Sequence, residues 1–338
     1  MEGGKELLRL ARSAGPDDIV LALFTGGASA LTTVPAEGLS LEDLRAVTSA
    51  MLACGATIDE LNAIRKHLSS FSGGLLVREA CPAEVITLLV SDVLGNSPDV
   101  IASGPTVPDQ STFADCWEII RRYGLADTFP PSVMERLEKG RQHLVPETPK
   151  KGDPVFSRTH TSLIATLEDA LTAAAVQAEA LGFQTQVMPE PLQGEARVRA
   201  REIVRLAQKE MAAMEKDNRP QCRLYGGETT VTLTGRGKGG RNQEMALAAC
   251  LAGAGTQSMA MLFGGTDGTD GPTDAAGGFA DGNAVYRLSD VPEKALETAA
   301  EALNRNDSYP VLEQMDMLFK TGPTLTNVMD MSIVLFWP

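Results

Sequence analysis

Short apolar runs alternate with amphipathic segments along most of this 338-residue chain. Runs rich in Val, Ile, Leu, Met and Phe predict strands at 19–24, 84–92, 223–233, 258–263 and 331–337. Apolar residues spaced three and four apart predict helices at 40–55, 57–71, 111–123, 131–140, 167–182, 194–216 and 292–306. Ser40, and Thr57 together with Glu60, supply helix caps. The run at 19–24 is apolar throughout, which is typical of a parallel strand buried on both faces.

The order of strand, glycine-containing loop and helix predicts an α/β fold with mostly parallel sheets flanked by helices. A chain of this length exceeds the usual size of one domain. The segment 144–156 has three prolines and a cluster of charges, so we expect a linker there and domains at 1–150 and 151–338. Ligands of such folds bind beyond the carboxyl ends of the strands, where this chain has loops rich in Gly, Ser, Thr and Asp.

The net charge of -14 argues against non-specific nucleic-acid binding, which needs a basic surface. Five cysteines without a CxxC pair indicate free thiols in a reducing compartment, and three histidines without HExxH argue against a transition-metal centre. Residues 1–15 predict a short amphipathic helix and not a signal peptide, and no run is long enough to span a membrane. We therefore expect a cytoplasmic protein whose ligands are small molecules.

Two loops in the first half carry candidate binding residues. Gly26, Gly27 and Ser29 follow the strand at 19–24 and suit a phosphate cradle, with a purely structural turn as the alternative. Arg65 and Lys66 lie shortly before a double glycine at 73–74 and suit a helix end that faces an anion. The alternative for these two cations is a solvated face of an amphipathic helix.

A third loop, 91–106, begins with Asp92 at the end of a predicted strand. Asp92 suits a metal ion or a substrate hydroxyl, and it equally suits the cap of a local turn. Ser103, Gly104 and Thr106 lie further along the same loop. They join the candidate ligand contacts.

The segment GGETTVTLTGRGKGGRNQE, 226–244, is the most specific piece of the sequence. Gly239 and Gly240 precede a helix whose first turn holds Arg241 and Asn242, and positive charge is unfavourable at that end of a helix. A bound anion would explain it, with Lys238 and Arg241 as phosphate-facing cations. The glycine spacing approaches a dinucleotide fingerprint, but the ribose-binding acid is missing from its usual place, and a Walker lysine is missing too.

The segment GGTDGTDGPTDAAGG, 264–278, follows a core-type strand directly, which argues against a linker. Its aspartates do not fit the EF-hand pattern, and no nonapeptide repeats. We expect a site loop in which Thr266 contacts a ligand and Asp267, Asp270 and Asp274 are partners of magnesium or of a hydroxyl. An acidic loop facing a basic glycine loop is the layout of a nucleotide-dependent phosphotransferase.

Together with TGPTLTNVMD, 321–330, these two segments resemble the C-terminal MOFRL domain of the class II glycerate kinases. TGGASAL (25–31), NAIRKHLSSFSGG (62–74) and SDVLGNSPDVIASGPTVPD (91–109) resemble the Rossmann-like N-terminal domain of the same proteins. The resemblance covers essentially the whole chain. It implies ATP-dependent phosphorylation of D-glycerate, commonly at the 2-hydroxyl, with Mg²⁺, and catalytic roles for Arg241 and Asp267. Asp270 is a second candidate for the magnesium.

The chain departs from the family pattern in two places. Family members normally begin with further strands and helices, including a GxGK-type turn whose lysine contributes to activity and then a HPxPD stretch, and neither motif occurs here. The glycine loop that usually has SGGGSAL is TGGASAL. We therefore expect a first domain that lacks part of its sheet, an exposed strand edge and impaired catalysis.

Two other functions stay open. The family has also carried the name hydroxypyruvate reductase, against which the missing ribose acid argues. A non-catalytic ligand-binding chain would account for the missing N-terminal segment. In the leading interpretation the ligands are ATP, Mg²⁺ and glycerate, and a homo-oligomer is left open.

Overall fold

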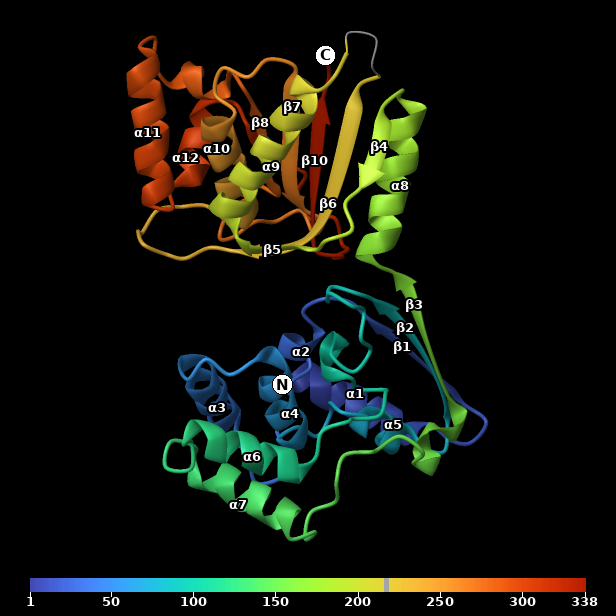
Figure 1. Cartoon of the computed structure of the whole chain (residues 1–338). Helices are drawn as coiled ribbons and strands as arrows, with labels where there is room; N and C mark the ends of the chain where they lie inside the picture. The colour runs from blue at the N-terminus through green and yellow to red at the C-terminus, as the bar shows by residue number, and fades with distance from the viewer. Residues whose placement is uncertain (216–218) are drawn as a thin grey trace. The chain divides into compact units, whose positions relative to one another are not determined.

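The computed structural model describes residues 1–215 and 219–338 and divides the chain into two compact units, Met1–Ile164 and Ala165–Pro338. Each unit has its own sheet and its own apolar core, so the α/β class is confirmed (Figure 1). The end of the helix predicted at 194–216 lies outside the described residues at position 216.

The first unit contains a three-stranded sheet in the order β1 (Ile19–Phe24), β2 (Glu84–Val90), β3 (Thr159–Ala165). The first two strands run parallel, and their inward side chains pack with α1 (Glu2–Ser13) and α5 (Leu75–Ala80). On the opposite face Ile19, Leu21 and Leu23 are 62%, 58% and 66% exposed. The apolar run therefore predicts the strand correctly but its burial wrongly, because the described helices of this unit pack against one side of this edge strand.

A second core in the first unit joins four helices: α3 (Leu41–Ala53), α4 (Ile58–His67), α6 (Phe113–Tyr123) and α7 (Pro131–Arg141). The helix caps predicted at Ser40 and Thr57 are confirmed, and both are capping boxes. Each hydroxyl accepts a hydrogen bond from the N–H of the third helical residue, and the carboxylate of that residue accepts one from the backbone N–H of the cap. Three short helical turns complete the unit: α2 (Ala28–Leu31), η1 (Ile101–Ser103) and η2 (Pro154–Arg158).

The segment 144–156 packs within the first unit and is not the linker that its composition indicates. The Glu147 carboxylate lies 2.8 Å from His67 of α4, and the Thr148 hydroxyl donates to Asp109 at 2.8 Å. The division between the units falls later, where β3 leads into α8.

The second unit is built on a seven-stranded mixed sheet in the order β4-β6-β10-β7-β8-β9, with β5 also beside β6. The strands are β4 (Gln184–Val187), β5 (Leu192–Glu195), β6 (Gln221–Thr230), β7 (Met259–Gly265), β8 (Gly277–Asp281), β9 (Leu318–Phe319) and β10 (Asp330–Phe336). β4 and β5 run parallel to β6, and the other pairs are antiparallel. The expectation of a mostly parallel sheet is wrong here, because a loop without a helix joins β7 to β8, whereas parallel neighbours need a crossover.

Helices cover both faces of β6 in the second unit: α8 (Leu167–Ala180) on one side and α9 (Ala196–Ala212) on the other (Figure 1). Leu167 of α8 fills the space above Gly226, and Glu210 of α9 pairs with Arg223. The remaining helices are α10 (Arg241–Ala252), η3 (Ala284–Leu288), α11 (Pro292–Asn304) and α12 (Ser308–Gln314). Residues 242–250 of α10 are all buried, so its polar first turn must find partners inside the protein.

Among the described residues, every helix falls short of the length and apolarity that a bilayer span requires.

Candidate functional site

A cavity of about 290 Å³ opens at the carboxyl ends of β1 and β2 in the first unit. It is lined by residues 25–30 after β1, by Asn62 and Arg65 of α4, by Asp92 after β2, and by residues of η1 that include Ser103. Ser29 Oγ and Ser103 Oγ lie 3.1 Å apart. Parallel strands bring their following loops to one edge of the sheet, which is why these distant segments meet.

The two ionisable residues of this cavity have no protein partner among the described residues. Neither Arg65 nor Asp92 makes a side-chain hydrogen bond or ion pair with another described residue, although both are partly buried. Burial lowers the pKa of the Arg65 guanidinium and raises the pKa of the Asp92 carboxyl. Both charges are therefore held in a poorly hydrated place where a polar ligand would stabilise them.

The turn beside the cavity is strained. Ala102 and Ser103 have φ values of 53° and 60° and are followed by Gly104 at 61°. A non-glycine residue costs about 1–2 kcal/mol in this left-handed region. The N–H groups of Gly73 and Gly74 hold the turn by donating to the carbonyls of Ser103 and Gly104, at 3.0 and 2.8 Å. The double glycine thus shapes the cavity wall, while Gly104 itself lies outside the lining.

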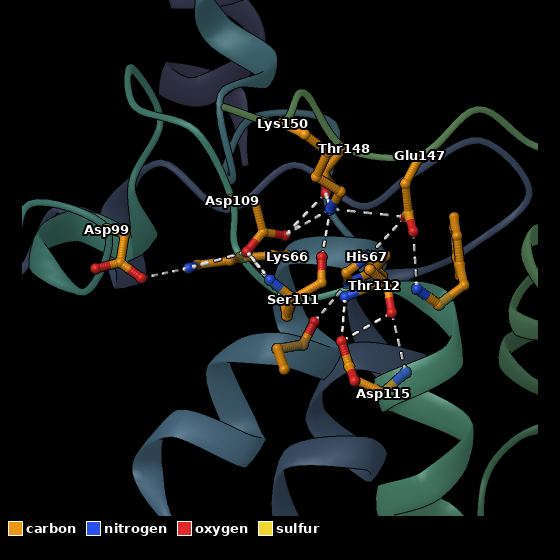
Figure 2. A network of polar contacts seen from close by, with 12 residues as sticks. Lys66, His67, Asp99, Asp109, Ser111, Thr112, Asp115, Glu147, Thr148 and Lys150 are labelled. Atoms are coloured by element: carbon orange, nitrogen blue, oxygen red, sulfur yellow. Dashed lines mark hydrogen bonds and ion pairs between the residues drawn. The ribbon is translucent and has the colours of Figure 1, made fainter. Parts of the chain in front are cut away.

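Arg65, Lys66 and His67 are consecutive, but only Arg65 lines the cavity. Lys66 is 4% exposed, and its Nζ lies 3.4 Å from Asp99 and 3.3 Å from Asp109 (Figure 2). Consecutive helical residues point about 100° apart, so the run of three cations cannot share one face. The solvated basic face is therefore ruled out, and Lys66 is not placed to meet a ligand in the cavity.

The network around Lys66 and His67 fastens α4 to the segments near 109 and 147–150 (Figure 2). His67 Nδ1 lies 2.7 Å from the Ala63 carbonyl, and its Nε2 lies 2.8 Å from Glu147. Burial would raise the pKa of Asp109, but the charge of Lys66 and its other partners outweigh burial and lower it. Thr106 is also buried near this segment, at 2% exposure. This network is a structural support for the cavity, since it fixes the helix that carries Arg65.

In the second unit the amino end of α10 is occupied by a carboxylate of the chain itself. The side chain of Asp270 accepts hydrogen bonds from the backbone N–H groups of Asn242 and Gln243, at 3.1 and 2.8 Å, and from the Gln243 amide at 3.0 Å. Burial raises the pKa of Asp270 to about 6, against the hydrogen bonds, which lower it. The anion expected at this helix end is therefore Asp270, and its oxygens are already engaged, which argues against the predicted magnesium role.

The glycines before α10 are needed for backbone contacts and do not form an open cradle. A Cβ on Gly239 would lie 2.2 Å from Ser308 Oγ, and one on Gly240 would lie 2.4 Å from Asp270. Lys238 points along the same surface, with Nζ 3.8 Å from the centre of the Tyr309 ring. These contacts account for the glycine spacing without a phosphate, and they leave Asn242 buried beneath Asp270.

Arg241, the first residue of α10, is held by two carboxylates. Its Nε and Nη2 donate to the two oxygens of Asp330 at 2.5 and 2.9 Å, and Nη1 lies 2.7 Å from Glu228. Burial would lower the pKa of Arg241, but the hydrogen bonds and charge of Asp330 outweigh burial and raise it. A guanidinium has five N–H donors, so a side chain that is 35% exposed keeps two of them for a ligand.

The loop after β7 is fixed by the segment before β10. The Thr266 hydroxyl donates to the Met329 carbonyl at 2.7 Å and accepts from the Val328 N–H at 2.8 Å. Asp267 is half-buried, and its carboxylate accepts from the N–H and hydroxyl of Thr269 at 2.9 and 3.0 Å. Thr266 is thus used structurally, whereas the Asp267 side chain stays accessible at the surface of the loop.

Two different sequence families match the chain, one within each structural unit. Residues 1–138 match the family described as "Domain of unknown function (DUF4147)", and residues 221–330 match the MOFRL family. A D-glycerate 2-kinase of Thermotoga maritima is 39% identical over 330 residues, which cover 97% of this chain and 75% of that protein. The chain belongs to the glycerate kinase family. This confirms the resemblance drawn from the motifs.

Other members of the family show a similar extent of likeness. A glycerate 2-kinase of Pyrococcus horikoshii is 40% identical over 96% of this chain and 72% of its own length. A relative from Agrobacterium vitis, 39% identical over 99% of this chain, is named provisionally as a hydroxypyruvate reductase. The crystal structure of the Thermotoga maritima glycerate kinase superposes with a TM-score of 0.86, covering 99% of this chain and 77% of that one at 38% identity.

Asp270 predicts a pH-dependent stability for this family member. A carboxyl whose pKa is raised on folding stabilises the fold fully below its ordinary value of 3.8, and that contribution is lost as pH rises through about 6. Asp270→Asn should remove this loss, which is about 3 kcal/mol in the free energy of unfolding. Urea unfolding from pH 4 to 7 measures it. Asp290→Asn, at an exposed carboxylate, is the control, and parallel pH profiles for wild type and Asp270→Asn would contradict the assignment.

Gly268 predicts a second stability difference. Its φ is 85°, and a Cβ there would lie 2.0 Å from the Gly322 carbonyl oxygen. Gly182 has a similar φ of 96°, but an added Cβ meets no described atom within 4 Å. Gly182→Ala should cost about 1–2 kcal/mol for the backbone alone, and Gly268→Ala should cost clearly more because it separates two loops. Equal losses in thermal unfolding would refute this packing argument.

Proposed function

We propose that this chain transfers the γ-phosphoryl group of ATP to the 2-hydroxyl of D-glycerate, forming 2-phosphoglycerate and ADP. The observation that carries the proposal is likeness over nearly the whole chain to proteins named as glycerate kinases, at 39% and 40% identity. Arg241 and Asp267 of the second unit offer polar groups that this chemistry needs.

The main requirement for catalysis of phosphoryl transfer is to stabilise the negative charge of the transferring group. The glycerate oxygen forms a bond to the γ-phosphorus, the bond from that phosphorus to the bridging oxygen breaks, and the hydroxyl proton is released. Negative charge is spread over the oxygens of the transferring group in between. Arg241 suits this role because Asp330 and Glu228 fix its guanidinium while two N–H donors remain available.

Mg²⁺ accompanies ATP in this proposal and would shield the phosphate charges when bound. Among the described residues there is no group of three or more His, Cys, Asp or Glu side chains placed to hold a metal. Magnesium needs no such cage, because it binds through one or two carboxylates and substrate phosphates. Asp267 fits that demand with its half-buried carboxylate, and Asp270 does not.

A hydroxypyruvate reductase is the second candidate, because two relatives carry that provisional name. A reductase of this kind needs a loop that approaches the pyrophosphate of a nicotinamide cofactor. The glycine loop at 235–240 is instead packed against the chain's own backbone at Arg305 and Asp307. This packing argues against binding of a dinucleotide at the loop 235–240. The rate of NADH oxidation in the presence of hydroxypyruvate tests the reductase function directly.

Arg241 provides the main test of the kinase proposal. Arg241→Lys keeps a cation beside Asp330 but loses the planar fork, so we expect the fold to persist and kcat to fall roughly 100- to 1,000-fold. ATP-dependent formation of phosphoglycerate is the assay, with product identity determined by NMR. Circular dichroism checks that the variant is folded.

Arg201→Lys, at an exposed position of α9, is the matched control and should retain wild-type activity. A wild-type kcat for Arg241→Lys would show that the guanidinium of Arg241 is not needed for phosphoryl transfer. Binding of glycerate or ATP by the wild type without turnover would instead assign a non-catalytic binding role, and 3-phosphoglycerate as product would correct the site of transfer.

A further inference from the structure

The cavity of the first unit differs from every other charged cluster described above in having an unsatisfied cation. Lys66 is paired with Asp99 and Asp109, and Arg241 is paired with Asp330 and Glu228. Arg65 is partly buried and makes no such contact with any described residue. A guanidinium withdrawn from water without a partner is costly, so its natural partner is an anion supplied from outside the chain.

The other polar groups of the cavity are suited to hydroxyls. Asp92 is an unpaired carboxylate that accepts hydrogen bonds, and Ser29 and Ser103 meet across the cavity at 3.1 Å. Asn62 adds an amide that is 7% exposed. One cation, one acceptor carboxylate and the hydroxyl residues Thr25, Ser29 and Ser103 match a ligand that carries one anionic group and one or more hydroxyls.

The cavity has room for a small hydroxy acid, and its charge favours a monoanion over a nucleotide. A volume of about 290 Å³ holds roughly ten water molecules at their volume in the liquid. That is room for a three-carbon hydroxy acid. A triphosphate carries several negative charges, whereas Arg65 is the one cation among the described residues that line this cavity, and the Asp92 carboxylate lies in the same lining.

We infer that this cavity is the hydroxy-acid subsite, in which Arg65 binds the substrate carboxylate and Asp92 accepts a hydrogen bond from a substrate hydroxyl. The inference rests on the proposed function for the identity of the acid as glycerate. Arg65 is then the residue that distinguishes an acid from a neutral polyol of the same size. The network around Lys66 and His67 positions it by fixing α4.

Arg65→Gln tests the carboxylate contact in the full chain. Its KM for D-glycerate should rise roughly 10- to 100-fold, as expected for the loss of charge-assisted hydrogen bonds, with KM for ATP changed less than about twofold. Arg65→Lys should recover part of the loss. Arg121→Gln, at an exposed arginine of α6, is the control. A raised KM for ATP with unchanged glycerate affinity would overturn the inference in favour of a phosphate site.

Calorimetry separates this inference from the proposed function. Wild type should bind D-glycerate and not glycerol, and Arg65→Gln should lose that difference. Asp92→Asn should weaken glycerate several-fold without affecting propionate, which lacks hydroxyls. Glycerate binding without turnover would leave the subsite standing while the kinase proposal fails. Phosphoglycerate formation by the wild type, together with unchanged glycerate affinity in Arg65→Gln and Asp92→Asn, would support the kinase proposal and overturn the subsite.

Discussion

A charge taken out of water must be met by an opposite charge or by oriented dipoles, and this requirement organises both units. Asp270 is met by the N–H groups at the start of α10, and Arg241 is met by Asp330 and Glu228. Lys66 is met by two aspartates. Each pairing ties together segments far apart in the chain, so satisfying the charge also fixes a loop. Arg65 departs from the rule, which is why its cavity stands out as a place for a ligand.

Several glycines of this chain are required by close contacts between two backbones, and not by the conformation of a loop. The stretch 264–278 has a composition that argues against regular structure, yet Gly264 and Gly265 end β7, and Gly277 and Gly278 begin β8. A Cβ on Gly277 would lie 1.9 Å from the Phe263 carbonyl oxygen. β8 therefore begins with glycine because two backbones approach closely there, and the intrinsic strand propensity of a residue does not reflect such a contact. The same reason explains why the glycine loop before α10 resembles a phosphate cradle in sequence but is filled by neighbouring chain.

Features that depend on neighbouring residues were predictable, and features that depend on distant partners were not. The helix caps at Ser40 and Thr57 are complete within four residues, and the sequence predicts a cap at both positions. The burial of β1 depends on helices elsewhere, so the apolar run alone misjudges it. Helical geometry did offer one missed signal: consecutive cations at 65 and 66 must point in different directions. The sequence predicts a bound anion at the start of α10, whereas the carboxylate found there is that of Asp270, 28 residues from Asn242.

The compensation of Arg241 by two acids has a consequence for catalysis. One positive and two negative groups give the cluster no net attraction for a resting anion, so tight ground-state binding of phosphate is not its function. Asp330 and Glu228 also hold the guanidinium of Arg241 in one orientation. A hydrogen-bond donor that is already oriented stabilises most strongly the negative charge that develops in the transition state of phosphoryl transfer. Arg65 has the opposite character, since it is uncompensated and suited to binding a permanent anion. In the two proposals above, Arg241 therefore stabilises changing charge, and Arg65 separately recognises a fixed charge.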